Sequence, residues 1–127
     1  MKIVSGLYYT KDHEWVKVEG KEALVGITDF AQHALGAIVY VELPEVDDEI
    51  EGEESFGTIE SVKAASDMLM PVTGTILEVN EELENDPSLV NSAPYETWIM
   101  KISLSNPADL DELMNADEYE AFCKEEA

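Results

Sequence analysis

The chain has 127 residues, a length that suits one domain with a buried core, so we expect a single domain over residues 1–127. Seven lysines, no arginine and 29 Asp plus Glu give a formal net charge of -22, which repels nucleic acid and anionic lipid headgroups. No apolar run approaches the roughly 20 residues that a membrane-spanning helix needs. The composition therefore argues against nucleic-acid binding and against membrane insertion.

Two explanations of this acidity stay open. One is solubility or adaptation to salt, and the other is docking to partners with basic surfaces, whose association would weaken as salt screens the attraction.

The N-terminal residues lack both the apolar segment of a secretory signal and the Arg-rich segment of a transit peptide. We therefore expect a cytoplasmic protein of bacterial type, or a mature form in the mitochondrial matrix.

The sequence predicts many short strands with helices between them. Alternating or β-branched runs bounded by Gly and Pro predict strands at 13–19, 22–28, 37–43, 55–62, 66–72, 75–79 and 98–104. Cap residues and stop signals predict short helices at 29–36, 80–83 and 86–91, and a C-terminal helical segment from 106 that breaks near 115–117. The expected fold is mainly β, with a flattened barrel or sandwich-like core, short peripheral helices and a C-terminal helical segment.

Two helix details can be tested against a structure. In the segment 29–36 we expect Asp29 to be the N-cap and Gly36 the stop, with Phe30, Ala34 and Leu35 facing inward. In the segment 86–91 we expect Asn91 to end the helix.

Lys63 is the only Lys or Arg between Lys21 and Lys101, and the small residues around it, such as Ala64 and Ala65, cannot bury it. A lysine that acts as a base or a Schiff-base nucleophile needs burial or neighbouring cations, and this stretch supplies neither. Because the flanking runs predict two strands that meet here, we expect the amine at a hairpin tip. The pattern favours a covalent attachment point over a catalyst.

The stretch Glu60-Ser-Val-Lys63-Ala, with Gly57 before it and Ser66-Asp67 and Pro71-Val-Thr-Gly74 after it, resembles the lipoyl-attachment motif of glycine cleavage system H proteins. Further similarities follow the order of that family from Gly6 to about Tyr119: His13-Glu-Trp15, Val25-Gly-Ile-Thr28, Leu35-Gly36, Val41-Glu-Leu-Pro44, Val79-Asn80, Asn91, Tyr95 and Trp98. Two departures concern turns, since Asp47 stands where a glycine is frequent and residues 94–98 contain no glycine.

Other carrier families fit the motif less well. A biotin carrier would be expected to have Met on both sides of the lysine, and a lipoyl domain of a 2-oxoacid dehydrogenase usually has Asp immediately before it. Here the flanking residues are Val62 and Ala64.

The resemblance implies covalent lipoate, as N6-lipoyllysine at Lys63, on a protein that is not itself an enzyme. In the family the arm carries an aminomethyl group from the pyridoxal-phosphate-dependent glycine decarboxylase (P protein) to the tetrahydrofolate-dependent aminomethyltransferase (T protein). Dihydrolipoyl dehydrogenase (L protein) then reoxidises the arm, and a lipoate ligase or a lipoyl/octanoyl transferase attaches it. We expect a monomer, because no self-complementary stripe is evident.

The resemblance also implies a groove that shelters the loaded arm, with Glu14 and Asp67 as its acids and Asp12 as a weaker candidate. A cationic amine would be held there by carboxylates. For Asp12 and Glu14 the competing interpretation is a solvated surface charge.

Three other assignments complete the sequence-based picture. Cys123 is alone and is expected to be a packed thiol, while His13 and His33 lack metal-ligand spacing. Two rival functions remain: a lipoyl relay for lipoate transfer or a sulfur-oxidation pathway, and an acidic interaction domain whose Lys63 is never modified.

Overall fold

The computed structural model describes residues 2–126, so Met1 and Ala127, the ends of the expected domain, lie outside the described residues. The strands are β1 (Tyr8–Tyr9), β2 (Glu14–Glu19), β3 (Glu22–Ile27), β4 (Ile38–Val41), β5 (Glu49–Ile50), β6 (Ser55–Ser61), β7 (Ala65–Leu69), β8 (Gly74–Val79) and β9 (Met100–Leu104). The helical segments are α1 (Asp29–Leu35), α2 (Glu82–Asn85), α3 (Leu89–Ser92), a 3₁₀ helix η1 (Pro107–Glu112) and α4 (Ala116–Glu126).

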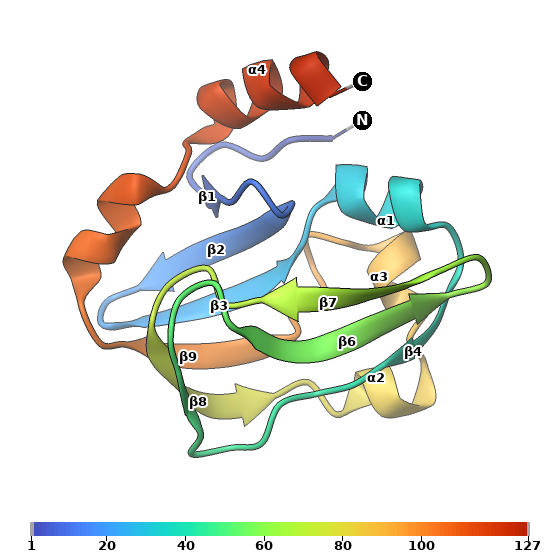
Figure 1. Ribbon diagram of the computed structural model, residues 1–127, viewed down its shortest axis with the longest axis horizontal. Coiled ribbons are helices and arrows are strands. Elements are labelled where there is room, and N and C mark those ends of the chain that lie inside the picture. Colours follow the sequence, from blue (N-terminus) through green and yellow to red (C-terminus); the bar gives the residue numbers. More distant parts are fainter. Residues whose placement is uncertain (1, 127) are drawn as a thin grey trace.

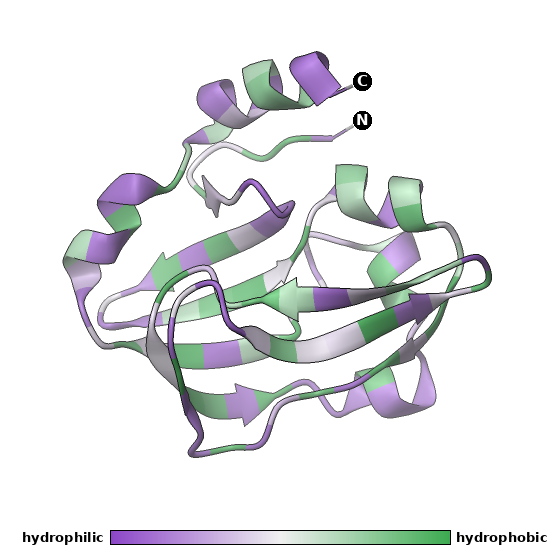
Figure 2. Ribbon diagram, in the orientation of Figure 1, coloured by the Kyte–Doolittle hydropathy of each residue, from purple (hydrophilic) through white to green (hydrophobic). Residues whose placement is uncertain are grey.

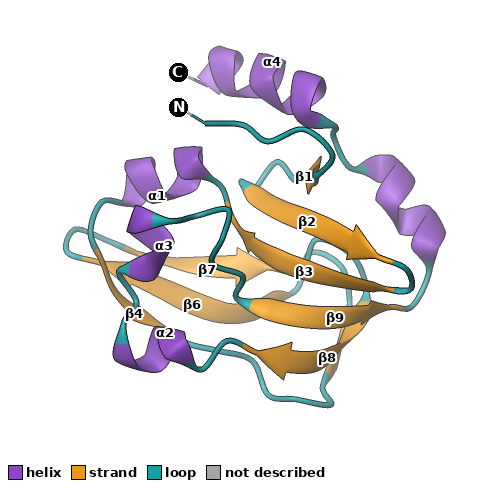
Figure 3. Ribbon diagram, turned by 180° about the vertical axis from the view of Figure 1, so that it is seen from behind, coloured by secondary structure: helices purple, strands orange, loops and turns teal. Residues whose placement is uncertain are grey.

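Two antiparallel sheets lie face to face, and neither closes into a barrel (Figure 1). The larger sheet has the order β1-β2-β3-β9-β8-β5, and the smaller has the order β4-β6-β7. The view from behind shows α1, α2 and α3 gathered at one end of the sheets, and α4 above β1 and β2, beside the N-terminal segment (Figure 3). The mainly β fold with peripheral helices and a C-terminal helix is thus confirmed.

The main core lies between the sheets because each contributes its apolar face. Hydrophobic and hydrophilic residues alternate along strands of both sheets, whereas α4 is largely hydrophilic (Figure 2). The larger sheet contributes Val16, Val25, Ile76 and Ile102, and the smaller sheet contributes Ile38, Val41, Ile59 and Met68.

A second, aromatic cluster fixes α4 to the larger sheet. The rings of Tyr9 and Tyr119 stack with centroids 4.5 Å apart, next to the buried Trp15. Cys123 is a buried free thiol in the same cluster, as expected for a packed cysteine. The break before α4 is also confirmed, since η1 ends at Glu112 and α4 begins at Ala116.

The strand predictions hold within a few residues, but two short strands, β1 and β5, were not predicted. The cap of α1 was predicted wrongly: Thr28, not Asp29, is the N-cap, and its hydroxyl accepts the Ala31 N–H at 3.2 Å. Thr and Asp are both good N-cap residues. The chain is still extended at Thr28 as it leaves β3, so Thr28 takes the cap position. Gly36 ends α1 as predicted, with a φ of 82°.

One inward-facing assignment and one predicted helix end also fail. Ala34 is exposed, and Ala31 packs against the core in its place beside Leu35. Asn91 does not end its helix but lies within α3, which is capped at Ala93. The side chain of Asn91 is instead engaged by other segments, which the local sequence pattern could not show.

The turn at Asp47 explains one departure from the family pattern. Asp47 has a φ of 77°, in the left-handed region where glycine is favoured and Asp is tolerated. Its N–H donates to the Ile76 carbonyl at 2.8 Å, which ties this acidic loop to β8. No helix of residues 2–126 is long and apolar enough to cross a membrane.

Substitution of Gly57 by Ala tests the close contact between β4 and β6. A Cβ at Gly57 would clash with the Glu42 backbone carbonyl, so Gly57→Ala should lower the free energy of unfolding by about 1–3 kcal/mol, as for other overpacking substitutions. Urea unfolding measures this loss. Ser66→Ala, at an exposed position of the same hairpin, is the control and should change the stability little; equal stability of both variants would contradict the close contact.

Candidate functional site

Lys63 lies at the tip of the β6–β7 hairpin, where Val62 and Lys63 form the turn between Ser61 and Ala64. The Ser61 N–H donates to the Ala64 carbonyl at 2.7 Å and closes the turn. The Ser61 hydroxyl accepts the N–H groups of Lys63 at 3.3 Å and of Ala64 at 3.1 Å. Neither turn residue has a positive φ, so this is not one of the primed turns that best match strand twist. The hydrogen bonds that the Ser61 hydroxyl accepts stabilise this turn instead.

The turn is anchored at its base by the segment that follows α1. The Val62 N–H donates to the Ala37 carbonyl at 3.0 Å. Asn91 holds the same segment: its side chain accepts the Ile38 N–H at 2.8 Å and donates to the Gly36 carbonyl at 2.9 Å. Sequence reasoning missed the roles of Ser61 and Asn91, although the local serine in the turn was a usable signal.

The amine of Lys63 is presented to solvent. The residue is exposed, and the ion pairs formed within residues 2–126 do not include it. Gly36 lies beneath its aliphatic stem, where a Cβ would come within 3.4 Å of the Lys63 Cε. The end of α1 therefore lies next to the Lys63 side chain.

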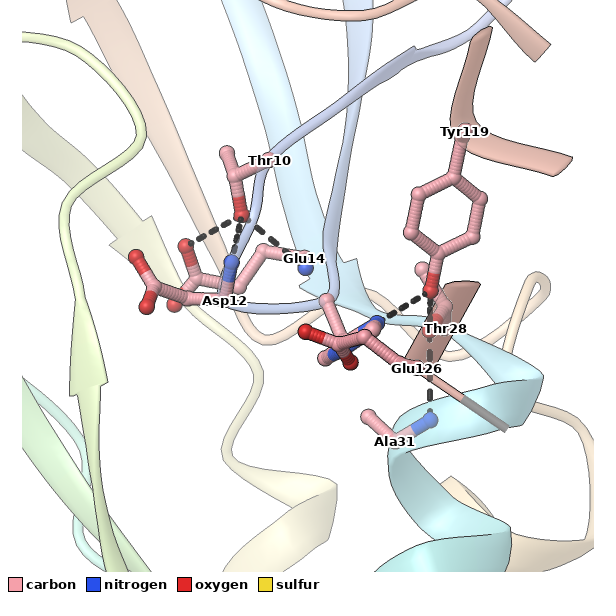
Figure 4. A network of polar contacts seen from close by, with 8 residues as sticks. Thr10, Asp12, Glu14, Thr28, Ala31, Tyr119 and Glu126 are labelled. Atoms are coloured by element: carbon pink, nitrogen blue, oxygen red, sulfur yellow. Dashed lines mark hydrogen bonds and ion pairs between the residues drawn. The ribbon is translucent and has the colours of Figure 1, made fainter. Parts of the chain in front are cut away.

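Glu14 is not a solvated surface charge, because only 2% of its surface is exposed. Its Oε2 accepts the Leu69 N–H at 2.9 Å, and its Oε1 accepts a longer bond from the Thr10 hydroxyl at 3.4 Å. The first bond crosses from β2 of the larger sheet to β7, the edge of the smaller sheet. Figure 4 shows Thr10 between Glu14 and the backbone of Asp12.

The pKa of Glu14 is raised to about 8, mainly by burial and to a lesser extent by the nearby negative charge of Asp12, while the hydrogen bonds from Leu69 and Thr10 oppose the shift. At neutral pH the carboxyl group is therefore largely protonated. A buried carboxyl of this kind is often found at a functional site.

The structure brings three of the four predicted site residues to one region and leaves the fourth apart from them. Asp12 is exposed and adjoins Glu14 through Thr10, and Asp67 is exposed on β7, two residues before Leu69. Lys63 lies beyond the other end of β7. Five residue steps from Ala64 to Leu69 correspond to about 17 Å along a strand, so only a long arm on Lys63 would reach Glu14.

Beside Asp12 the surface forms a cleft of about 460 Å³, which also borders the segments 51–53, 70–73 and 109–114. Its lining includes four further acids, Glu51, Glu53, Asp109 and Glu112. The cleft begins at Asp12, and the residues that line it do not include Lys63.

His13 has a structural role at this end of the molecule. Its two ring nitrogens lie 2.7 Å from the Tyr119 hydroxyl and 2.7 Å from the Glu126 carboxylate. Tyr119 also contacts the Thr28 hydroxyl at 2.7 Å, which connects α4 to the start of α1. Within residues 2–126, no group of three His, Cys, Asp or Glu side chains is arranged to hold a metal ion.

Comparison with known proteins places this hairpin and fold in a family. The family model described as Glycine cleavage H-protein matches residues 7–126. The chain belongs to the glycine cleavage H-protein family. The resemblance carried by the motif around Lys63 is thereby confirmed.

Individual relatives cover nearly the whole chain. A glycine cleavage system H protein of Alkaliphilus oremlandii is 61% identical over 127 residues, covering 100% of both chains. One of Thermoanaerobacter pseudethanolicus is 56% identical over 126 residues, covering 99% of this chain and 100% of that one. The crystal structure of a glycine cleavage system H protein from Mycobacterium marinum matches with a TM-score of 0.88 at 36% identity, covering 96% of this chain and 99% of that one.

Membership in the H-protein family makes the chain a lipoyl carrier of the glycine cleavage system. The geometry fits such a group, because the amine of Lys63 is exposed on a turn that is anchored to Ala37.

The raised pKa of Glu14 predicts a measurable pH dependence of stability. Between pH 4.5, near the pKa of an unfolded Glu, and about pH 8, the folded state binds the extra proton, so this group's contribution to stability falls as pH rises, by up to about 1.4 kcal/mol per pH unit. Glu14→Gln removes the titration but keeps an oxygen for the Leu69 N–H. The difference in unfolding free energy between Glu14→Gln and wild type should therefore increase from pH 5 to pH 8.

Urea unfolding at several pH values measures this difference, in which the titrations of the other carboxylates cancel. Glu19→Gln, at an exposed position of the same strand, serves as the control and should give a difference that varies little with pH. A constant difference for Glu14→Gln would show that the carboxyl of Glu14 is ionised in the same pH range folded and unfolded.

Proposed function

We propose that Lys63 carries the lipoyl group and that the chain shuttles an aminomethyl group between the enzymes of glycine cleavage. The observation that carries this proposal is an exposed lysine on a turn held by Ser61 and anchored to Ala37, within a family of lipoyl carriers. A rigid base suits an arm that must reach several enzymes, because the attachment point then stays fixed while the arm moves.

Attachment is an acyl transfer from an activated lipoate, such as an acyl adenylate or an acyl thioester, delivered by a lipoate ligase or a lipoyl/octanoyl transferase. The Nζ of Lys63 loses a proton and forms an amide bond to the acyl carbon, while the bond from that carbon to the adenylate or the thiol breaks. The chain contributes an accessible amine, and the enzyme contributes the activated acyl group.

The bound lipoyl group supplies a disulfide that takes up the aminomethyl group at glycine decarboxylase (P protein), gives it up at aminomethyltransferase (T protein) and is reoxidised by dihydrolipoyl dehydrogenase (L protein). The chain itself contributes no catalytic group to these steps. The carrier and its partners must share a compartment, which for a bacterial-type chain is the cytoplasm.

Between these enzymes, Glu14 is proposed to hold the cationic amine of the carried group, with Asp67 beside it and Asp12 in a lesser role. The Oε2 of Glu14 accepts the Leu69 N–H at 2.9 Å, whereas within residues 2–126 its Oε1 accepts only the longer bond from Thr10 and so keeps the capacity to accept from a stronger donor. An arriving cation would favour the carboxylate form of Glu14, since a nearby positive charge offsets the desolvation that raises its pKa.

The attachment proposal is tested by the intact mass of protein purified from its own host or lipoylated with a lipoate ligase. Wild type should gain the mass of one lipoyl group, Lys63→Arg should gain none, and Lys21→Arg should behave as wild type, since Lys21 is an exposed lysine at another hairpin. Wild type that stays unmodified under lipoate-replete conditions would exclude both this function and a lipoyl relay. It would leave an interaction domain as the alternative.

The role of Glu14 is tested with lipoylated protein loaded with the aminomethyl group. Glu14→Gln retains the acceptor for Leu69 but loses the negative charge, so release of ammonia from the loaded arm should accelerate roughly tenfold or more, the loss expected for a charge-assisted hydrogen bond. Glu19→Gln should release ammonia at the wild-type rate. Equal release rates in all three proteins would remove Glu14 from the proposed site.

A further inference from the structure

A tight turn at residues 10–13 leads from β1 into β2 and ends at the buried Glu14. The His13 N–H donates to the Thr10 carbonyl at 3.1 Å, and the Thr10 N–H donates to the Glu14 carbonyl at 3.0 Å. The Thr10 hydroxyl accepts the Glu14 N–H at 3.2 Å and also contacts the Oε1 of the Glu14 carboxyl. The position of this carboxyl therefore depends on the conformation of the turn.

His13 has an unusual backbone conformation in this turn. Its φ is 64°, in the left-handed region, which costs free energy for a residue with a Cβ. Such a conformation persists only where the surrounding structure fixes it. A backbone hydrogen bond fixes it in part, because the His13 carbonyl accepts the Thr28 N–H at 3.0 Å. The contacts of the imidazole ring supply the rest.

The imidazole ring of His13 is held between α1 and α4. It stacks on the ring of Phe30 in α1, with centroids 4.3 Å apart and planes 15° from parallel. Its two nitrogens contact Tyr119 and Glu126, both in α4 and both more than 100 residues later in the chain. Only 15% of the His13 side chain is exposed. Helix α4 thus provides both polar partners of the ring.

The donors and acceptors around His13 form an ordered chain. An ionised Glu126 can only accept, so the Nε2 of His13 carries a hydrogen and donates to it. In neutral His13 the Nδ1 then accepts the Tyr119 O–H, and the Tyr119 oxygen accepts the Thr28 O–H. Burial raises the pKa of the Tyr119 hydroxyl, which keeps it a donor at neutral pH. Figure 4 shows the Tyr119 ring directed from α4 toward Thr28.

We propose that α4 positions Glu14 for the loaded arm, with His13 as the residue that connects them. Tyr119 and Glu126 fix the His13 ring, and the ring keeps the turn in its left-handed conformation. The turn in turn holds the Glu14 carboxyl where it accepts the Leu69 N–H. His13 and α4 act through Glu14 and do not themselves touch the carried amine. The proposal rests on the proposed role of Glu14 in holding that amine.

The competing explanation is that α4 only stabilises the fold through the aromatic cluster. Tyr9 separates the two, because its ring is buried in the same cluster and stacks on Tyr119. The Tyr9 hydroxyl donates to the Val4 carbonyl at 2.6 Å, whereas the Tyr119 hydroxyl bonds to His13. Tyr9→Phe and Tyr119→Phe therefore each remove one hydroxyl from the same pair of rings, and only the second removes a partner of His13.

The first test follows ammonia release from lipoylated protein loaded with the aminomethyl group. Tyr119→Phe should accelerate release about threefold or more, the effect of losing one hydrogen bond, while Tyr9→Phe should release at the wild-type rate. Glu126→Ala removes an exposed acceptor at the end of α4, where the fold tolerates change, and should also accelerate release. Glu126→Gln keeps an oxygen for the Nε2–H and should restore most of the wild-type rate.

A double variant distinguishes positioning from general destabilisation. If Tyr119 acts through Glu14, the protein with both Tyr119→Phe and Glu14→Gln should release ammonia no faster than Glu14→Gln alone. Multiplication of the two single effects would contradict the proposal, because Tyr119 would then act independently of Glu14.

The pKa of Glu14 provides a second measurement, made on the unloaded protein. A loosened turn admits water to the carboxyl group, so the pKa of Glu14 should fall from about 8 toward that of an ordinary Glu, by about 1 in Tyr119→Phe and Glu126→Ala. It should change little in Tyr9→Phe. The carboxyl ¹³C chemical shifts of glutamate-labelled protein, followed against pH, give this value, and Glu14→Gln identifies the signal by its loss.

The outcomes separate this proposal from the function on which it rests. Unchanged ammonia release in Glu14→Gln would overturn both. Faster release in Glu14→Gln, together with wild-type release and an unchanged Glu14 pKa in Tyr119→Phe and Glu126→Ala, would overturn the positioning role alone. Equal acceleration in Tyr9→Phe and Tyr119→Phe would also overturn it, since α4 would then act only through the stability of the fold.

Discussion

The hydrogen bond from the Leu69 N–H to the buried carboxyl of Glu14 is the interaction on which the arrangement of this molecule depends. Strand β7 is the edge of a three-stranded sheet and has a strand partner on one side only. Glu14 gives its last residue a partner from the opposite sheet, which fixes the end of the hairpin farthest from Lys63. The cost is a carboxyl group taken out of water, which is why its pKa rises to about 8.

At the other end of the hairpin, hydrogen bonds from three residues fix the turn that carries Lys63. Ser61 holds the turn from within, the Ala37 carbonyl anchors it from the segment after α1, and Asn91 fixes that segment. The lysine itself contributes little to this framework and is free to be modified. This division suits the proposed attachment of lipoate to Lys63, because the neighbours of the lysine fix the turn while its side chain extends from them.

Charge gives the modification a further physical consequence. Lys63 is the only Lys or Arg between Lys21 and Lys101, and the strands around it carry Glu42, Glu60 and Asp67 on one face. Acylation removes its positive charge and leaves that whole stretch without a Lys or Arg charge. Modified and unmodified protein thus differ in their electrostatic attraction to a basic partner, in the direction of stronger attraction after modification.

The sequence by itself determined the mainly β fold, the position of Lys63 at a hairpin tip and the family, because these follow from local alternation, turn residues and a contiguous motif. Tertiary structure alone decided that Glu14 is buried, that Thr28 rather than Asp29 caps α1, and that Asn91 binds Gly36 and Ile38 instead of ending a helix. Each of these depends on a partner distant in the chain or on the turn that precedes it. Local periodicity describes the face a residue occupies, whereas burial and hydrogen bonding across sheets depend on which segments fold against it.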